Sequence, residues 1–391
     1  MNIEKTTKTK FIYIDSVQIV KNSMLWGFLE LGYEVIRPDI KVDLHSYSEE
    51  TVLALIEEIK KGDVAVTRNF VPAVAEACRR VNVPYISWVY DSPQVALFTK
   101  EAEYETNHIF MFDRGGMDYV LGCHKMNIYH LPLAANITEA SIVDISDEDI
   151  EKFACQISFV GSLYNKEYLC QNRVSPDVLS ELKSRIRINI GEYSDVKNYY
   201  SLFDDEIYGK YSNLINMKGT EGTGITERFL MDQLYGMPLI AHEEREMYIN
   251  RAAEKYDTRF YTGEVDVQNI KAKICPPVRP EDEMYKVFYS SKINLNITHR
   301  GILTGIPQRV FDIMAVGGFV LSNYQSEIEE FFNIGEEIEV FHDMKEFDEK
   351  LDYYLNHEKE RIRVGINGYL KVNELYNYRL ATEIMIEKTL G

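Results

Sequence analysis

A glycine turn set between an alternating segment and a helical segment is the feature that most restricts the fold of this chain. Residues 293–297 alternate apolar and polar side chains as a strand does, and residues 304–307 supply a cap, a flexible turn and a first-turn proline. The helix that should begin near Pro307 ends at Gly317-Gly318, before the apolar run 319–321. This segment therefore predicts a strand, loop, helix, strand unit.

Two charged residues lie on one face of the predicted helix. Arg309 stands in its first turn and Asp312 follows three residues later. At the carboxyl edge of a parallel sheet, helix amides and a guanidinium bind a diphosphate well, and a carboxylate can reach ribose hydroxyls. A surface ion pair on an ordinary helix explains the same spacing, so the residues alone leave both interpretations open.

Strands and helices alternate along the whole chain. Strands are predicted near 11–15, 34–36, 64–67, 85–89, 109–112 and 127–131 in the first half, and near 157–160, 186–190, 238–240, 259–261, 293–297 and 319–321 in the second. This alternation indicates an α/β fold with two parallel, doubly wound sheets. A chain of 391 residues with 45% hydrophobic content is long enough for two cores.

An acidic stretch marks the predicted boundary between the two domains. Residues 143–149 carry four carboxylates and no basic side chain, which favours a segment that runs over the surface. We therefore predict one domain over residues 1–150 and a second that begins at residue 151.

The charge balance and the chain start restrict the class of protein. With 43 basic and 62 acidic residues the net charge is −19, which disfavours nucleic acid or an anionic membrane as a partner. The first residues lack a signal peptide, and no run approaches the roughly 18 apolar residues of a membrane helix. We expect a soluble, cytoplasmic protein with no nucleic-acid partner and no integral membrane segment.

Three ordered motifs carry a family resemblance. The first is Gln308 to Phe319, with the pattern Gln-Arg-x-Phe-Asp/Glu followed by Ala-x-Gly-Gly/Ala-Phe. The second consists of residues 85–93, 109–113 and 130–134 taken together. The third is residues 157–164. Together they resemble group 1 glycosyltransferases, and more closely the bacterial CgeB-like branch. The resemblance implies a GT-B-like architecture of two Rossmann-like domains facing an interdomain cleft, with the second domain over 151–365 and a helix over 366–391 that packs back on the first domain.

The resemblance also implies that the second domain binds a nucleotide-sugar donor. The expected donor-binding residues are Gly161, Ser162, Lys166, Thr304, Gly305, Ile306, Arg309 and Asp312. From the residues alone, a solvated lysine at a helix start is the favoured interpretation of Lys166, because isolated lysines are usually surface residues. Many retaining members have a glutamate eight positions before the ribose carboxylate, where this chain has Thr304. The choice between a retaining and an inverting reaction therefore stays open.

Two carboxylates and a histidine in the first half are candidates for the general base of sugar transfer. Asp15 ends the first predicted strand and Asp91 the fourth, so both are expected at the carboxyl edge of the sheet. We prefer Asp91, with His108 as the next candidate. A turn or helix cap before Pro93 explains Asp91 equally well, and a lone histidine more often has a structural role.

No cofactor or metal is expected besides the donor substrate. The nearest matches to a metal-binding Asp-x-Asp element are Asp147-Glu148-Asp149 and Asp204-Asp205, and both stretches are typical of solvated loops. Arginine, lysine and helix amides can neutralise a diphosphate without a metal.

The sequence thus predicts a glycosyltransferase that moves a sugar from a nucleotide-sugar to a hydroxyl of a glycan or protein acceptor. Two alternatives stay open. A nucleotide-sugar epimerase of the same fold would convert the donor sugar without an acceptor, and a noncatalytic sugar-binding or nucleotide-binding protein would bind its ligand without turnover.

Overall fold

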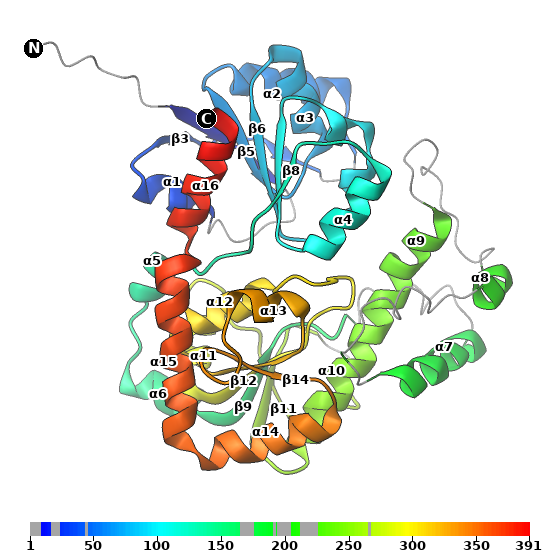
Figure 1. The fold of residues 1–391 in the computed structure, drawn as a ribbon, viewed down its shortest axis with the longest axis vertical. Helices are drawn as coiled ribbons and strands as arrows, with labels where there is room; N and C mark the ends of the chain where they lie inside the picture. Colours follow the sequence, from blue (N-terminus) through cyan, green and yellow to red (C-terminus); the bar gives the residue numbers. More distant parts are fainter. Residues whose placement is uncertain are drawn as a thin grey trace, which may run out of the picture. The chain divides into compact units, whose positions relative to one another are not determined.

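The computed structural model describes residues 9–16, 24–43, 46–164, 176–190, 193, 205–211, 226–264 and 267–391. The chain divides into two compact units (Figure 1). Unit 1 comprises Met1–Asn136 and Tyr376–Gly391, and unit 2 comprises Ile137–Leu375. Each unit is built around a six-stranded parallel sheet and is described by itself.

The sheet of unit 1 has the strand order β3-β1-β5-β6-β7-β8. Its strands are β1 (Lys10–Tyr13), β3 (Glu34–Ile36), β5 (Val64–Arg68), β6 (Tyr85–Val89), β7 (Asn107–Met111) and β8 (Ile128–His130). All six strands predicted for the first half are present. The side chains of β6 are buried throughout, as expected for a parallel strand covered by helices on both faces. The longer helices of this unit are α1 (Met24–Glu30), α2 (Glu49–Ile59), α3 (Pro72–Val81) and α4 (Arg114–Cys123).

The C-terminal helix α16 (Tyr378–Leu390) belongs to unit 1 and packs against α1 (Figure 1). Asn377 caps it, because its side chain accepts a hydrogen bond from the main-chain N–H of Leu380 at 3.0 Å. The hydroxyl of Tyr90, just after β6, donates to the hydroxyl of Tyr378 at 3.0 Å. Gly27 of α1 lets the two helices approach, since a Cβ there would lie 2.0 Å from Oγ1 of Thr382.

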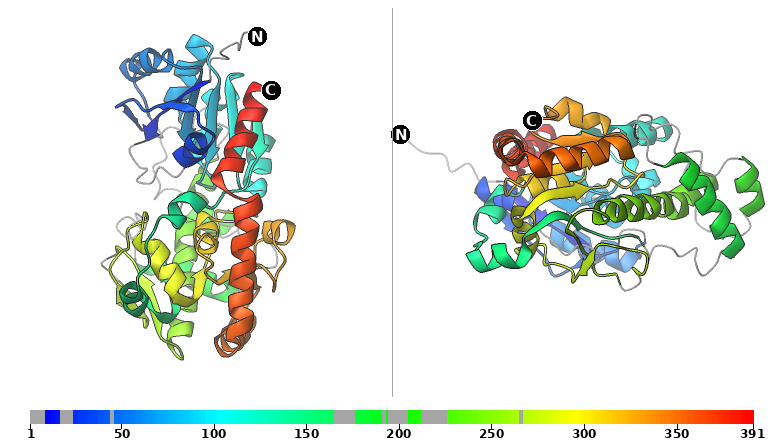
Figure 2. Two further views of the ribbon diagram at one scale, coloured as in Figure 1. Left: turned by 90° about the vertical axis from the view of Figure 1, so that its left-hand side faces the viewer. Right: turned by 90° about the horizontal axis from the view of Figure 1, so that it is seen from below.

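The sheet of unit 2 has the strand order β11-β10-β9-β12-β13-β14, and helices flank it (Figure 2). Its strands are β9 (Cys155–Val160), β10 (Thr258–Tyr261), β11 (Lys273–Cys275), β12 (Ser291–Asn296), β13 (Val320–Asn323) and β14 (Glu339–Phe341). Its helices include α5 (Ile137–Ser141), α6 (Asp147–Phe153), α7 (Pro176–Asn189), α8 (Asp205–Tyr211), α9 (Glu227–Met231), α10 (Met237–Ala253), α11 (Glu283–Ser290), α12 (Gln308–Met314), α13 (Ser326–Phe331), α14 (Met344–Asn356) and α15 (Glu358–Leu375). The order of the central strands confirms the doubly wound fold predicted from the sequence.

Two predicted strands of unit 2 are wrong. Residues 186–190 lie at the end of α7, and residues 238–240 lie in the first turn of α10. Short apolar runs do not distinguish a buried helix from a strand, and α10 is buried over most of its first half. The strands that take their place in the sheet, β11 and β14, have only three residues each and so gave little periodic signal.

The acidic stretch 143–149, predicted to be a linker, lies within unit 2 and begins a helix there. Ser146 and Asp149 form a capping box at the start of α6. Asp149 also pairs with Lys286 of α11 at 2.9 Å, and this hydrogen bond, together with those from Ser146, lowers the pKa of Asp149 to about 2. The carboxylates that resembled a metal-binding element therefore start and anchor α6.

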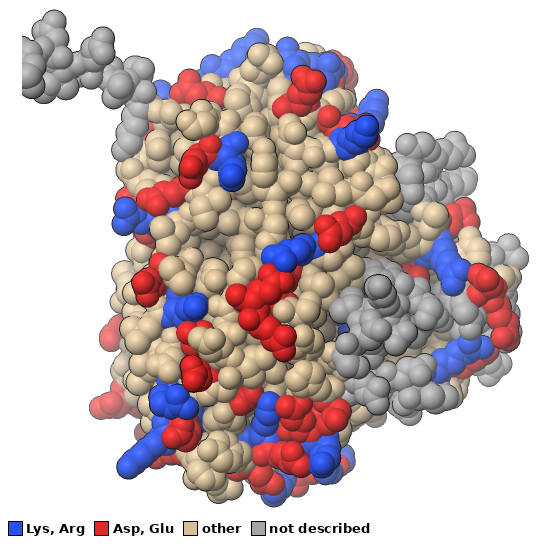
Figure 3. All heavy atoms as spheres, viewed as in Figure 1, with Lys and Arg blue, Asp and Glu red and all other residues tan. Residues whose placement is uncertain are grey.

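Basic and acidic side chains are interspersed over the described atoms of the face in Figure 3. No broad basic field covers the described part of that face, in line with the net charge of −19. A site for an anion must therefore be built locally from a few basic residues.

Candidate active site at the carboxyl edge of unit 2

Arg309, in the first turn of α12, reaches back over the end of the unit 2 sheet. Its Nη1 donates a hydrogen bond to Oδ1 of Asn296, the last residue of β12, at 3.2 Å. Its guanidinium lies 5.0 Å from the ring centre of Phe159 in β9. Gly161, directly after β9, leaves room for it, because a Cβ there would lie 2.6 Å from Nη2 of Arg309. The structure thus brings together Gly161 and Arg309, which the resemblance implied for one site, at the carboxyl edge of the sheet.

A second arginine, which was not predicted from the sequence, lies close to the first. Arg245 of α10 is 3% exposed and donates to the carbonyl of Ile297 from Nε at 3.1 Å and Nη2 at 2.9 Å. Its Nη1 donates to the carbonyl of Ser162 at 2.6 Å, and its guanidinium lies 4.6 Å from the ring centre of Tyr164. Arg245 therefore ties α10 to the loops that follow β9 and β12.

The two guanidinium groups have no carboxylate partner within ion-pair distance among the described residues. Loss of solvent, and next the positive charge of Arg245, lower the pKa of Arg309 to about 10, so Arg309 still carries its charge at neutral pH. Buried like charges are unfavourable unless an anion offsets them. In a chain of net charge −19, this pair is the candidate for a local anion site.

His299 lies against Tyr164, the ring that Arg245 also contacts. Its ring meets that of Tyr164 edge to face, with the centres 4.8 Å apart, and its Nδ1 accepts a hydrogen bond from the main-chain N–H of Gly301 at 3.0 Å. Burial, and next the charge of Arg245, lower the pKa of His299 to about 3. The imidazole is therefore neutral at physiological pH.

Ser162, another residue expected to bind the donor, holds the shape of the loop that follows β9. The hydroxyl of Ser162 donates to the carboxylate of Glu264, which follows β10 and also accepts from the main-chain N–H of Leu163 at 2.9 Å. Ser162 Oγ accepts in turn from the main-chain N–H of Tyr164 at 2.7 Å. Lys166 lies outside the described residues, as does Asp204.

The turn before α12 departs from the prediction in one respect. Pro307, not Thr304, is the cap of the helix, and the hydroxyl of Thr304 donates to Oε1 of the buried Glu327 in α13 at 2.6 Å. Gly305 and Ile306, which stand between Thr304 and Pro307 in the chain, are both buried. Thr304 therefore fixes this loop to α13.

Asp312 does not pair with Arg309. Its Oδ1 accepts a hydrogen bond from Nε2 of Gln308 at 2.9 Å, one helical turn earlier. The residue is 7% exposed, and no described residue hydrogen-bonds to its Oδ2. One carboxylate oxygen thus remains able to accept hydrogen bonds from a ligand.

The three candidate bases of unit 1 have different surroundings. Asp91 follows β6, is exposed, and accepts a hydrogen bond from Nδ2 of Asn69 at 2.6 Å. Asp15 is engaged in an ion pair with Arg37 at 2.6 Å. His108 pairs with Ile86 at the start of β6, so it lies toward the amino end of the sheet, away from Asp91. Of the three, only Asp91 combines a carboxyl-edge position with a carboxylate that has no ion pair among the described residues.

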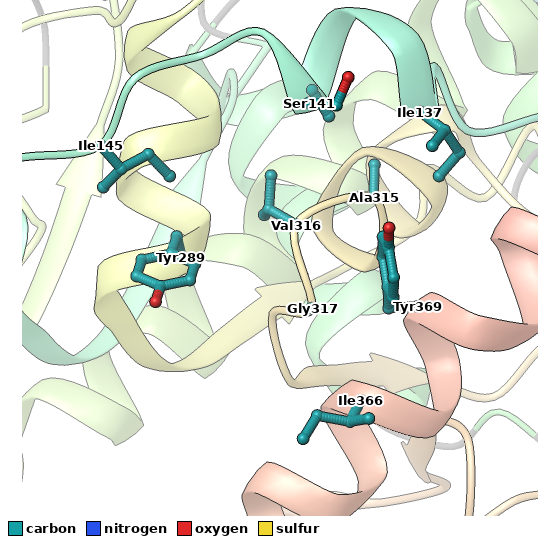
Figure 4. Close-up of a pocket in the computed structure, with 10 residues that line it drawn as sticks. Ile137, Ser141, Ile145, Tyr289, Ala315, Val316, Gly317, Ile366 and Tyr369 are labelled. Atoms are coloured by element: carbon teal, nitrogen blue, oxygen red, sulfur yellow. The ribbon is translucent and has the colours of Figure 1, made fainter.

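A separate apolar pocket lies at the other end of α12 (Figure 4). It has a volume of about 270 Å³ and is lined by Ile137, Ala140, Ser141, Ile145, Tyr289, Ala315, Val316, Gly317, Ile366 and Tyr369. None of these lining residues is basic, so the pocket offers a diphosphate no charged partner. We therefore place the candidate site at Arg309 and not in this pocket.

The described residues contain no group of three or more histidine, cysteine, aspartate or glutamate side chains that could hold a metal ion. No helix among them is long and apolar enough to cross a membrane.

Replacing Gly161 by alanine tests whether this glycine makes room for the arginine. The new methyl group would push the guanidinium of Arg309 aside, and we expect the affinity for inorganic pyrophosphate, a probe of the candidate anion site, to fall roughly tenfold, since misplaced binding groups lose much of their effect. Stability should change little, because the clash is with the flexible end of a side chain. Calorimetric titration measures the affinity. Gly263→Ala is the matched control at the same sheet edge, where a Cβ would lie 3.8 Å from Pro277 in ordinary contact. Equal affinities for the two variants would contradict this role of Gly161.

Comparisons with known proteins agree with this fold, and part of the chain matches a family model. Residues 241–386 match a protein family described as glycosyl transferase-like. A glycosyltransferase from Rickettsia africae ESF-5 has a similar structure, with a TM-score of 0.53 and 12% identity over 98% of this chain and 100% of that chain. Sucrose-phosphate synthase from Thermosynechococcus elongatus gives 0.53 and 8% identity, and Anabaena HepE in complex with UDP-glucose gives 0.51 and 8%, each over 97% of this chain and 98% of that chain.

No curated protein matches the chain by sequence. At these low identities the structural likeness concerns the fold, which is GT-B, with two parallel six-stranded sheets and flanking helices. Residues 241–386 are thus similar to a glycosyl transferase-like family, and the whole chain shares its GT-B fold with structures of glycosyltransferases.

Proposed function

We propose that this enzyme transfers a sugar from a nucleoside diphosphate sugar to a hydroxyl group of an acceptor. The observation that carries the proposal is the pair of guanidinium groups of Arg245 and Arg309 beside Gly161, at the carboxyl edge of the unit 2 sheet. A diphosphate supplies the negative charge that this pair lacks, and open parallel sheets bind nucleotides at that edge.

The guanidinium groups of Arg245 and Arg309 can stabilise a nucleoside diphosphate as the leaving group. Negative charge grows on the leaving oxygen as its bond to C1 of the sugar breaks. Arg245 is held by the carbonyls of Ser162 and Ile297, and Arg309 by Asn296, so both groups stabilise that charge without first reorganising. The acceptor oxygen forms the new bond to C1, the acceptor proton passes to a base, and the nucleoside diphosphate leaves. For an inverting course we propose Asp91 as that base.

We propose UDP as the first candidate for the donor nucleotide. HepE shares the fold and holds UDP-glucose, which makes UDP-sugars the first donors to test. The motif over residues 308–319 further supports a place in the CgeB-like branch.

Asp312 is proposed to bind the ribose of the donor through its available Oδ2. We expect Asp312→Asn to weaken UDP binding about fivefold to tenfold, because a neutral amide accepts hydrogen bonds less strongly than a carboxylate. Binding of inorganic pyrophosphate, which has no ribose, should not change. Calorimetric titration with both ligands measures the difference, and Asp118→Asn on the exposed surface of α4 is the control. An equal loss for both ligands would contradict the ribose assignment.

Turnover tests the function itself. The full chain is incubated with sugars linked to UDP, GDP, CDP and TDP, with and without hydroxyl acceptors, and release of nucleoside diphosphate and formation of a glycoside are followed. Acceptor-dependent release from one donor supports the transferase. Conversion of the donor sugar without an acceptor would indicate an epimerase, and tight binding without any turnover would indicate a binding protein; either result overturns the proposal.

A further inference from the structure

The side chain of His299 is placed among the groups that form the anion site. It stands three residues after the end of β12, and Tyr164 lies against it from the loop that follows β9. Arg245 lies over the same tyrosine ring at 4.6 Å. Tyr164 therefore contacts both His299 and Arg245, and Arg245 in turn is close enough to lower the pKa values of His299 and Arg309.

The hydrogen bonding of His299 fixes which nitrogen carries the proton. Its Nδ1 accepts from the main-chain N–H of Gly301 at 3.0 Å, so the proton of the neutral ring is on Nε2. No described residue hydrogen-bonds to Nε2, and the side chain is half-buried rather than enclosed. This N–H is therefore oriented by the protein and available to a ligand.

The surroundings of His299 keep the ring neutral. The charged or titratable groups that face it are Arg245 from α10 and Tyr164 from the loop after β9, and no carboxylate contacts it among the described residues. A protonated ring would place another positive charge close to the guanidinium of Arg245. A neutral N–H donor adds a hydrogen bond without that repulsion.

We propose that His299 binds the donor directly, by donating a hydrogen bond from Nε2 to a non-bridging oxygen of the diphosphate. This inference rests on the proposed function, because it takes the diphosphate to lie at Arg245 and Arg309. The histidine joins the two arginines as a third donor, one that leaves the charge of the site unchanged.

Two conservative variants separate this role from a structural one. In His299→Gln the side-chain amide places an N–H near the position of Nε2, whereas in His299→Asn the side-chain oxygen stands near Nδ1 and keeps the bond from Gly301. Calorimetric titration of the full chain with inorganic pyrophosphate is the measurement. We expect His299→Asn to bind about tenfold more weakly and His299→Gln to stay within about threefold of the unmodified chain. A role limited to holding the loop through Gly301 predicts the opposite order and would overturn the inference.

A third variant distinguishes failure of the inference from failure of the donor site. If Arg309→Met weakens pyrophosphate binding but both His299 variants bind as the unmodified chain does, the donor site stands and His299 does not contact the diphosphate. If the unmodified chain does not bind pyrophosphate, or Arg309→Met leaves its affinity unchanged, the donor site is itself misplaced. The affinity ratio between the unmodified chain and His299→Asn should also stay constant from about pH 5.5 to pH 8, since the ring does not titrate there.

Discussion

Replacing Arg309 by methionine should lower the rate of sugar transfer by roughly 100-fold to 1,000-fold, the loss typical of a single group that stabilises charge in the transition state. Methionine fills much of the same volume but cannot offset the charge of the departing diphosphate. The stability of the ligand-free chain should not fall, because the substitution also removes a partly buried charge that Arg245 repels. Steady-state rates with saturating donor, and the thermal midpoint without ligand, measure the two effects.

The expected pattern is a loss of activity without a loss of stability. The matched control is Arg363→Met, which removes an exposed arginine of α15 that pairs with Glu360, and it should keep full activity. Addition of UDP should raise the thermal midpoint of the control but not that of Arg309→Met. Normal turnover of Arg309→Met would show that the reaction does not need Arg309. Unfolding of the variant before the assay would show that Arg309 serves the fold.

Part of the site could be predicted because the carboxyl ends of parallel strands meet at one edge of a sheet. Gly161 and Arg309 stand far apart in the chain, yet each follows a strand of one parallel sheet, and the structure brings them into contact. His299 follows the end of β12 in the same way. The same position after the end of a strand therefore also pointed to His299, which was not among the predicted site residues.

Arg245 shows what the sequence could not reveal. It stands beside Glu243, Glu244 and Glu246, and such a run is typical of the solvated face of a helix. In the structure Glu244 is buried and pairs with Arg300, while Arg245 turns to the carbonyls of two loops. The burial of α10 depends on which helices pack around it, and local periodicity carries no information about that packing. The same limit explains why the apolar residues 238–240 resembled a strand.

Replacing Gly27 by alanine should destabilise unit 1 by about 3 kcal/mol, the cost of overpacking a well-filled contact. Alanine normally stabilises a helix relative to glycine by roughly 1 kcal/mol, so the sign of the effect is diagnostic. Here the added methyl group would lie 2.0 Å from Oγ1 of Thr382 and 2.5 Å from the carbonyl oxygen of Tyr378, and α1 and α16 would have to separate. The carbonyl belongs to the main chain of α16 and cannot turn away as a flexible side chain would.

Tryptophan fluorescence during urea unfolding measures this effect in unit 1 alone, because the chain has only two tryptophans, Trp26 and Trp88, and both lie in that unit. The control is Gly122→Ala in α4, where an added Cβ meets nothing within 4 Å, and it should raise the midpoint slightly or leave it unchanged. A double variant with Thr382→Ala should recover part of the loss, since it removes one of the two clashing atoms. If Gly27→Ala instead behaves like Gly122→Ala, the C-terminal helix does not rest on α1, and residues 376–391 do not belong to the core of unit 1.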